Sequence, residues 1–212
     1  MGELTYAERP ARGGADGLLV LHHGRGSDES QLLDLADALD PEHRLHVFLP
    51  RAPFSFPRLD GYHWYAVRDI RYAVGETFRE GYAQLCDFHD HIWSSTGIPA
   101  ERTVLGGFSM GGAMSYLTGL GGGRPRPAGI LALSGSIPTA ERWAPDFESR
   151  AGLPVLITHG RRDRIVRIRF AHSARSLLAD AGLDVTYREG RGGHAIDDWT
   201  IDHAIQWVAG VL

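Results

Sequence analysis

The chain has no lysine, a single cysteine and no long hydrophobic run, and each of these absences excludes a class of protein. All 22 basic residues are arginine, which excludes Schiff-base chemistry on lysine and phosphate loops that depend on lysine. Because Cys86 has no second cysteine to pair with, no disulfide can form within the chain. No apolar run approaches the roughly 20 residues of a membrane-spanning helix, so we expect no membrane insertion.

The N-terminus and the net charge narrow the classes further. Residues 1–10 lack the basic start and the apolar stretch of a secretory signal, so we expect a cytoplasmic protein. A net charge of −4 argues against a general nucleic-acid binder. A chain of 212 residues with 43% hydrophobic residues can bury a stable core, and we predict one globular domain over residues 1–212.

Short apolar runs alternate with amphipathic segments of helical length, a pattern typical of a parallel sheet flanked by helices. Six buried strands are predicted: Leu18–His22, Leu45–Leu49, Thr103–Phe108, Gly129–Leu133, Pro154–Thr158 and Asp184–Arg188. An earlier short strand over Leu4–Glu8 is expected to pair with Leu18–His22 at the sheet edge. Helices are predicted over Ser27–Leu39, Glu76–Thr96, Arg167–Ala181 and Asp197–Val211.

The segment Gly107-Phe-Ser109-Met-Gly111 follows a predicted strand and precedes a helix-like segment. This is the G-x-S-x-G pattern of a nucleophile elbow in its usual setting. Glycine is required at 107 and 111 because side chains there would collide with neighbouring backbone in the sharp turn. The pentapeptide alone also fits a glycine-rich turn with an incidental serine, so the partners of Ser109 decide between the two.

A nucleophilic serine needs a histidine base and an acid that orients it, in the chain order serine, acid, histidine for this fold. Asp163 follows the strand Pro154–Thr158, and His194 follows the strand Asp184–Arg188. Both therefore fall at the carboxyl edge of the sheet, where open α/β sheets bind ligands. Either residue alone would suit a surface loop, but their order and positions favour a triad with Ser109.

Other histidines and aspartates fit these roles less well. His172 and His203 fall inside predicted helices, and Asp146 follows no clear strand. Asp197 and Asp198 suit the N-cap and the first turn of the last helix. The prediction therefore remains Ser109, Asp163 and His194.

The oxyanion of an ester intermediate needs two backbone N–H donors. One is expected from Met110, the residue after the nucleophile, and the other from Arg25, in the glycine-rich loop after the first buried strand. Gly24 and Gly26 let this backbone approach a substrate oxygen, and Gly24 is expected to contact the substrate. A phosphate-cradling loop is the alternative, but no lysine or Walker spacing accompanies it.

Taken together, these motifs make the chain similar to the phospholipase/carboxylesterase family, which includes acyl-protein thioesterases and small bacterial carboxylesterases. The resemblance covers most of the chain and rests on five segments in order: His23-Gly-Arg-Gly-Ser27, Pro50-Arg-Ala-Pro53, Gly106-Gly-Phe-Ser-Met-Gly-Gly-Ala113, His159-Gly-Arg-Arg-Asp163 and Gly193-His194. It implies an α/β-hydrolase fold and a Ser–His–Asp hydrolase without metal or cofactor. The implied substrates are small esters, thioesters or lysophospholipids.

The chain departs from the family pattern at two places. Arg25 stands where many relatives carry an apolar residue, so a more polar mouth of the site is expected. The segment Arg164–Arg167 carries an arginine where proline is common. Neither departure touches the triad, but both leave the particular substrate open.

An aromatic segment from Pro53 to Tyr72 is expected either to line a pocket or to pack beneath its loop. Trp64 and Tyr65 are the residues predicted to form the pocket wall. No insertion is long enough for a full cap domain, which favours an open cleft for short to medium acyl groups. The spacing of the eleven histidines matches no zinc motif, so no metal site is predicted.

Two other function classes stay open from the sequence. A serine peptidase on the same scaffold would turn over peptides but not esters, and a non-catalytic relative would bind a ligand without hydrolysing it. The oligomeric state is also open, with a homodimer among the options.

Overall fold

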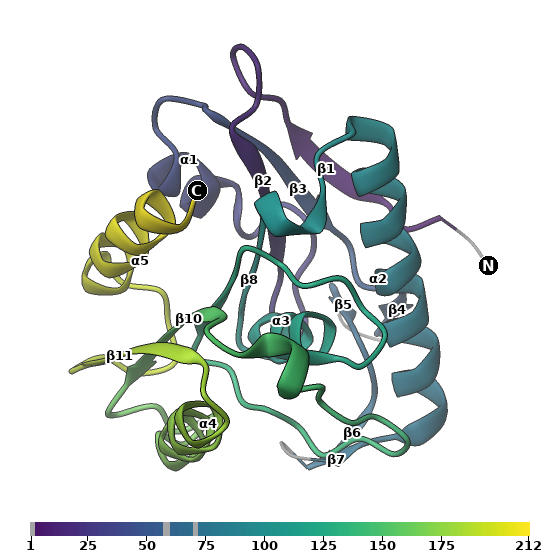
Figure 1. Cartoon of the computed structure of the whole chain (residues 1–212). Coiled ribbons are helices and arrows are strands. Elements are labelled where there is room, and N and C mark those ends of the chain that lie inside the picture. The colour runs from purple at the N-terminus through teal and green to yellow at the C-terminus, as the bar shows by residue number, and fades with distance from the viewer. Residues whose placement is uncertain (1–2, 57–59, 70–71) are drawn as a thin grey trace.

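The computed structural model describes residues 3–56, 60–69 and 72–212, and a seven-stranded sheet lies at the centre of these residues (Figure 1). Its strands are β1 Tyr6–Arg9, β2 Gly17–His22, β3 Leu45–Pro50, β8 Thr103–Phe108, β9 Gly129–Leu133, β10 Pro154–Gly160 and β11 Asp184–Gly190. The spatial order is β1-β3-β2-β8-β9-β10-β11. All neighbours pair in parallel except β1 and β3, which confirms the predicted mostly parallel sheet.

The N-terminal strand is predicted to pair with β2, and this prediction is wrong. β1 pairs antiparallel with β3, with Tyr6 opposite Pro50 and Arg9 opposite Val47. β2 has no free edge, because it already pairs with β3 on one side and β8 on the other. The side chain of Arg9 also holds β1 at the outer edge through an ion pair of 2.7 Å with Asp40.

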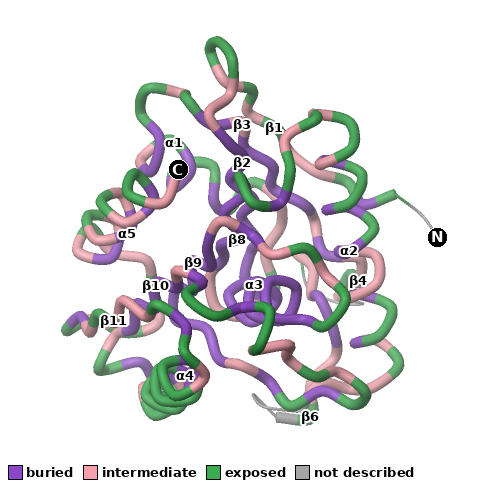
Figure 2. The backbone as a smooth tube through the Cα atoms, in the orientation of Figure 1, coloured by how far each residue is buried: buried purple, intermediate pink, exposed green. Residues whose placement is uncertain are grey.

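Helices cover both faces of the sheet, as predicted. Helices α2 (Gly75–Thr96), α3 (Met110–Leu120) and α4 (Arg169–Asp180) pack on one face, and α1 (Leu33–Leu39) and α5 (Asp198–Val211) pack on the other. Figure 2 shows buried residues concentrated in the central strands and in α3, whereas α4 and α5 expose their outer sides. Helix α3, which begins directly after Ser109, is therefore fixed inside the core.

Helix α1 begins at Leu33, six residues later than predicted, because local bonds hold the preceding loop in other conformations. The Asp28 carboxylate accepts the N–H and the hydroxyl of Ser30 at 2.9 and 2.6 Å. Ser27 forms an isolated antiparallel bridge with Tyr62. Side chains that bond to nearby backbone in this way compete with helix formation.

The connection between β3 and α2 crosses above the carboxyl edge of the sheet. It contains two small hairpins, β4 (Phe54–Ser55) with β5 (Tyr62–His63) and β6 (Val67–Asp69) with β7 (Tyr72–Ala73). Residues 57–59 and 70–71 of the aromatic segment lie outside the described residues. The described part of this connection is too short for a cap domain, which agrees with the expectation of an open cleft.

Two short 3-10 helices complete the secondary structure of the described residues, η1 over Ala100–Arg102 and η2 over Glu148–Arg150. Asp197 caps α5 as expected, since its carboxylate accepts the N–H of Thr200 at 2.9 Å. Within residues 3–56, 60–69 and 72–212, no helix combines the length and the apolarity needed to cross a membrane.

Candidate active site

Ser109 stands at the sharp turn between β8 and α3. Its backbone has φ 57° and ψ −117°, a conformation that is strained for any residue with a Cβ. The glycines of the motif make room for this turn, as expected. A Cβ at Gly111 would lie 1.8 Å from the carbonyl oxygen of His22, and one at Gly107 would lie 2.5 Å from the backbone of Gly111. The turn lifts the serine hydroxyl clear of the sheet.

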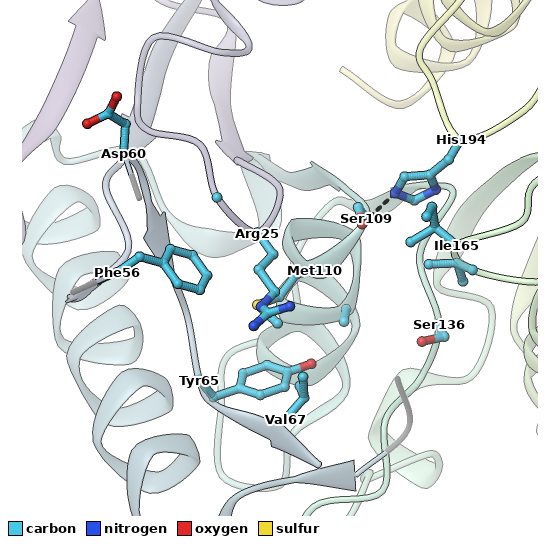
Figure 3. Close-up of a pocket in the computed structure, with 13 residues that line it drawn as sticks. Arg25, Phe56, Asp60, Tyr65, Val67, Ser109, Met110, Ser136, Ile165 and His194 are labelled. Carbon is cyan, nitrogen blue, oxygen red and sulfur yellow. Dashed lines mark hydrogen bonds between the residues drawn. The ribbon is translucent and has the colours of Figure 1, made fainter. Parts of the chain in front are cut away.

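The three predicted triad residues form one continuous chain of hydrogen bonds. His194 Nε2 lies 2.8 Å from Ser109 Oγ, and His194 Nδ1 lies 2.7 Å from Asp163 Oδ2 (Figure 3 shows the bond to Ser109). Asp163 lies on the loop after β10 and His194 on the loop after β11. The Asp163 side chain is fully buried, whereas the His194 ring is 17% exposed. Histidine thus faces the entrance and the acid lies behind it.

Both oxygens of the Asp163 carboxylate have polar contacts. Its Oδ1 accepts the N–H groups of Ile165 and Val166 at 2.8 and 2.9 Å. Its Oδ2, which contacts His194, also lies 3.3 Å from Nε2 of His159. Sequence reasoning missed His159, although it stands at the end of β10, only four residues before Asp163.

The loop after β2 is braced from inside by His23. The Nδ1 atom of this buried ring donates to the carbonyl of Gly24 at 2.8 Å, and its Nε2 accepts the N–H of Ala52 at 3.0 Å. Burial lowers the pKa of His23, which keeps the ring neutral and suits this pairing. The indole N–H of Trp64 donates to the His23 carbonyl at 3.0 Å.

Trp64 and Gly24 therefore have different places from those expected. Trp64 is fully buried in the core below the loop and does not line the pocket, because its indole N–H finds its acceptor there. Gly24 is also buried, and its N–H donates to the side-chain oxygen of Gln31 at 2.8 Å. Both residues support the loop instead of forming the wall that faces a substrate.

Two residues that line the same cavity as Ser109 have a backbone N–H without a protein partner in the described part of the chain. They are Arg25 and Met110, the two residues expected to form an oxyanion hole. The backbone after Arg25 is fixed, since the N–H of Gly26 donates to the carbonyl of Tyr62 at 2.8 Å. Met110 is the first residue of α3, where the partial positive charge of the helix favours an anion.

A cavity of about 660 Å³ opens beside Ser109 and His194 (Figure 3). Most of its wall is apolar or aromatic: Phe56, Tyr65, Val67, Met110, Ile165 and Val166. Tyr65 occupies the position predicted for it. Ile165 was not predicted, and its side chain is 62% exposed at the edge of the cavity. Ser136, which follows the end of β9, also lines the cavity and was overlooked although a strand-end position is a usable signal.

A chain of buried polar side chains supports the elbow from below. His22 contacts His89 between their Nε2 atoms at 3.1 Å and contacts Ser115 Oγ through Nδ1 at 2.9 Å. Ser115 donates to the carbonyl of Gly111 at 3.0 Å. The donor and acceptor in each of these hydrogen bonds follow from this last contact. Because the Ser115 hydroxyl donates to Gly111, its oxygen must accept from Nδ1 of His22, and Nε2 of His22 must accept from His89. Burial lowers the pKa of His22 to about 3 and also lowers the pKa of His89.

No cluster of three or more histidine, cysteine, aspartate or glutamate side chains suited to a metal ion occurs among the described residues. What the site offers chemically is a serine hydroxyl hydrogen-bonded to a histidine, a carboxylate behind that histidine, and two backbone N–H groups of residues that line an apolar cavity. Such a set can perform acyl transfer.

The fold and the arrangement at its carboxyl edge are those of an α/β-hydrolase. The sequence profile of the Phospholipase/Carboxylesterase family matches residues 9–211, and the chain belongs to this family. Among solved structures, esterase PE8 is 28% identical and superposes with a TM-score of 0.85 over 100% of both chains. A carboxylesterase from Mesorhizobium loti is 26% identical, with a TM-score of 0.81 over 97% of this chain and 94% of that one.

Curated relatives carry acyl-protein thioesterase names. Acyl-protein thioesterase 1 homolog 1 of Dictyostelium discoideum is 24% identical over 208 residues, 92% of this chain and 90% of that protein. Acyl-protein thioesterase 1 of Neurospora crassa is 37% identical over 114 residues. That match spans 51% of this chain and 46% of the Neurospora protein, which is less than half of its length. The family and these relatives are hydrolases of esters and thioesters.

Proposed function

We propose that the chain hydrolyses small carboxylic esters, thioesters or lysophospholipid-type acyl esters, with Ser109 as nucleophile, His194 as base and Asp163 as the acid that orients it. The observation that carries the proposal is the unbroken chain from Ser109 Oγ through both ring nitrogens of His194 to Asp163, with 2.8 and 2.7 Å contacts. Membership of the family supports the same class of reaction.

The proposed mechanism has two halves. In the first, His194 Nε2 takes the proton of Ser109 as Oγ attacks the carbonyl carbon, and the N–H groups of Arg25 and Met110 hold the oxyanion. His194 then gives the proton to the leaving alcohol or thiol, which leaves an acyl-enzyme. In the second half, His194 activates a water molecule that releases the acid and restores Ser109.

The apolar wall and the size of the cavity favour short to medium acyl chains. A cavity of about 660 Å³ accommodates a small ligand. Val67, Met110 and Val166 line it with side chains that an acyl chain can contact. The described residues leave the cavity uncovered by a cap domain, so a substrate reaches Ser109 from solvent.

The proposal is tested with p-nitrophenyl esters from acetate to decanoate and with Ser109→Ala as the variant. We expect the variant to lose at least about a thousand-fold in kcat/KM, because the nucleophile is removed. A fluorophosphonate should react once per chain with the wild-type protein and not with Ser109→Ala. Peptide mass spectrometry should locate the adduct on Ser109.

Ser173→Ala is the matched control. Ser173 is an exposed serine of α4 whose hydroxyl donates only to the carbonyl of Arg169, so this variant should keep full activity. A folded wild-type protein that cleaves none of these esters would contradict the proposal. Turnover of peptides in the same preparation would then favour a peptidase, and tight binding without turnover would favour a ligand-binding protein.

A further inference from the structure

The side chain of Arg25 lies inside the mouth of the catalytic cavity. Its guanidinium is 5.0 Å from the centre of the Phe56 ring. Figure 3 shows it extending from the loop toward Met110 and Tyr65, in the space between these residues and Phe56. The rest of this wall is largely apolar, so a formal positive charge stands among hydrophobic side chains beside the nucleophile.

This charge has no counter-charge among the described residues. No carboxylate lies within 4.0 Å of the Arg25 guanidinium there, and no hydrogen-bond acceptor is assigned to its N–H groups. Asp60 lines the same cavity, but Figure 3 shows its carboxylate pointing away from Arg25. The charge of Arg25 affects a neighbouring residue nonetheless, since it adds to burial in lowering the pKa of His63.

Arg51 on the neighbouring segment provides the contrast. Its guanidinium stacks 4.7 Å from the Tyr62 ring and is paired with the Glu29 carboxylate through two nitrogens. Both arginines therefore rest on an aromatic ring, but among the described residues only Arg51 is neutralised by a carboxylate. Glu29 occupies the planar fork of donors on Arg51, whereas no described residue occupies that of Arg25.

A guanidinium presents paired N–H donors that match both oxygens of a carboxylate. Arg25 is itself exposed, so salt screens its charge in part, but the apolar wall shields one side of a carboxylate that binds it. Arg164 and Arg167 are exposed and lie on either side of the cavity-lining pair Ile165 and Val166 in the sequence, so their positive charge attracts anions toward this part of the surface from a distance. The cavity thus combines a site for acyl chemistry with an unfilled site for an acidic group.

We propose that the site selects acidic esters, in which a carboxylate on a short chain binds the Arg25 side chain while the ester or thioester carbonyl lies at Ser109. The proposal rests on the hydrolase function proposed above and adds the chemical class of the substrate. The N–H of Arg25 then serves the reaction and its side chain serves recognition.

Three methyl esters of the same length but different charge test the proposal. They are methyl hydrogen adipate, its neutral amide methyl adipamate, and the cationic methyl 6-aminohexanoate. Hydrolysis of each is measured by titration of the released acid at constant pH. We expect kcat/KM to be at least about ten-fold higher for the carboxylate than for the amide. Added salt should reduce this ratio. The chain length at which kcat/KM is highest among half-esters from succinate to suberate then reports the distance from Ser109 to Arg25. Butyryl esters of ω-hydroxy acids test whether the carboxylate can lie on the alcohol side of the ester instead.

Arg25→Glu is the decisive variant because it reverses the charge and keeps the backbone N–H. We expect the order of the three substrates to invert, with the amine preferred over the carboxylate. The ratio between substrates is the readout, so a general loss of rate in the variant does not affect the conclusion. Arg12→Glu is the matched control, since Arg12 is exposed at the opposite edge of the sheet and the change in net charge is the same.

The outcomes separate the two proposals. Equal turnover of the carboxylate and the amide at every chain length would overturn the role of Arg25 and leave the hydrolase function standing. The same holds if Arg12→Glu changes the ratio between substrates as much as Arg25→Glu does. No turnover of any ester, including the p-nitrophenyl series, would overturn the hydrolase function itself.

Discussion

His159 is a buried histidine that acts through another residue. Its Nε2 lies 2.6 Å from the carbonyl of Val166 and 3.3 Å from Asp163 Oδ2, and both of these atoms can only accept. The ring must therefore carry its proton on Nε2. Burial lowers the pKa of His159, so the ring stays neutral beside the acid. We expect it to position the Asp163 carboxylate for His194.

Replacement of His159 tests this role at the scale of one residue. His159→Leu should lower kcat/KM by about ten-fold, because Val166 beside the acid loses its donor and Asp163 Oδ2 loses the polar N–H that lies 3.3 Å away. A carboxylate with fewer donors holds protonated His194 more strongly, so the acidic limb of the pH–rate profile should move to higher pH. His159→Gln should restore most of the rate, since its amide N–H can donate from the same place. A loss of stability with an unchanged pH–rate profile in both variants would show a purely structural role.

The sequence was sufficient to predict that Ser109, Asp163 and His194 lie together, because each follows the end of a parallel strand and such ends meet at one edge. It was insufficient for Trp64 and His159. Whether an aromatic ring faces a cavity or the core depends on which acceptor its N–H finds, and Trp64 finds the His23 carbonyl across 41 positions of sequence. Similarly, the position of the proton on Nε2 of His159 follows from contacts with Val166 and Asp163 that exist only in the folded turn.

At the scale of elements, α3 is anchored at both ends. Its N-terminus forms the elbow, and its C-terminus is capped by Arg150, a cation that is only 2% exposed. Arg150 donates to the carbonyls of Gly119, Gly121 and Arg124 at 2.7, 3.3 and 2.8 Å. A positive charge at a helix C-terminus also interacts favourably with the helix dipole. The core helix that presents Ser109 is thus fixed from the far end.

Arg150→Met should lower the free energy of unfolding by about 2–3 kcal/mol, because two buried carbonyls and one partly buried carbonyl lose a charged donor. Urea denaturation followed by circular dichroism measures the change. Arg142→Met is the control, since the Arg142 side chain is 79% exposed and should change stability by less than about 0.5 kcal/mol. Equal stability of the two variants would contradict the capping role.

The elements themselves were predictable to different degrees. The six strands predicted after residue 17 and the last three predicted helices are confirmed, since long periodic runs record burial on one or both faces. The start of α1 was not predictable from periodicity, because the Asp28–Ser30 turn and the bridge from Ser27 to Tyr62 override it. The partner of β1 depends on which edge of the sheet is free, which no local pattern records.

At the scale of the whole molecule, several buried neutral histidines make stability depend on pH. The pKa of His22 falls from its ordinary 6.5 to about 3, and the pKa values of His23, His89 and His159 are also lowered, in each case chiefly by burial. Below pH 6.5 the unfolded chain therefore binds more protons than the folded one. Stability is fully present above that pH and is lost as the pH falls toward 3.

For His22, whose pKa falls to about 3, the free energy of unfolding should decrease by about 2 kcal/mol between pH 7.5 and 5, and the other three buried histidines should add to this loss. Urea unfolding at pH 7.5 and 5 measures it. In His89→Gln, which can still donate to His22, the difference in the free energy of unfolding between the two pH values should be smaller than in the unmodified protein, because one buried neutral histidine is removed. His91→Gln, on an exposed side chain of the same helix, should behave like the unmodified protein. An undiminished difference in His89→Gln would argue that His89 does not contribute.

The loop from His23 to Ser27 is fastened on both sides of Arg25, through His23, Gly24 and the pairing of Gly26 with Tyr62. A substitution at a position held in this way changes the side chain while the backbone N–H stays in place. Over evolutionary time, substitutions at position 25 can therefore change which ester enters without disturbing how it is cleaved. Divergence of substrate preference among related chains would then require one codon and no rearrangement of the backbone.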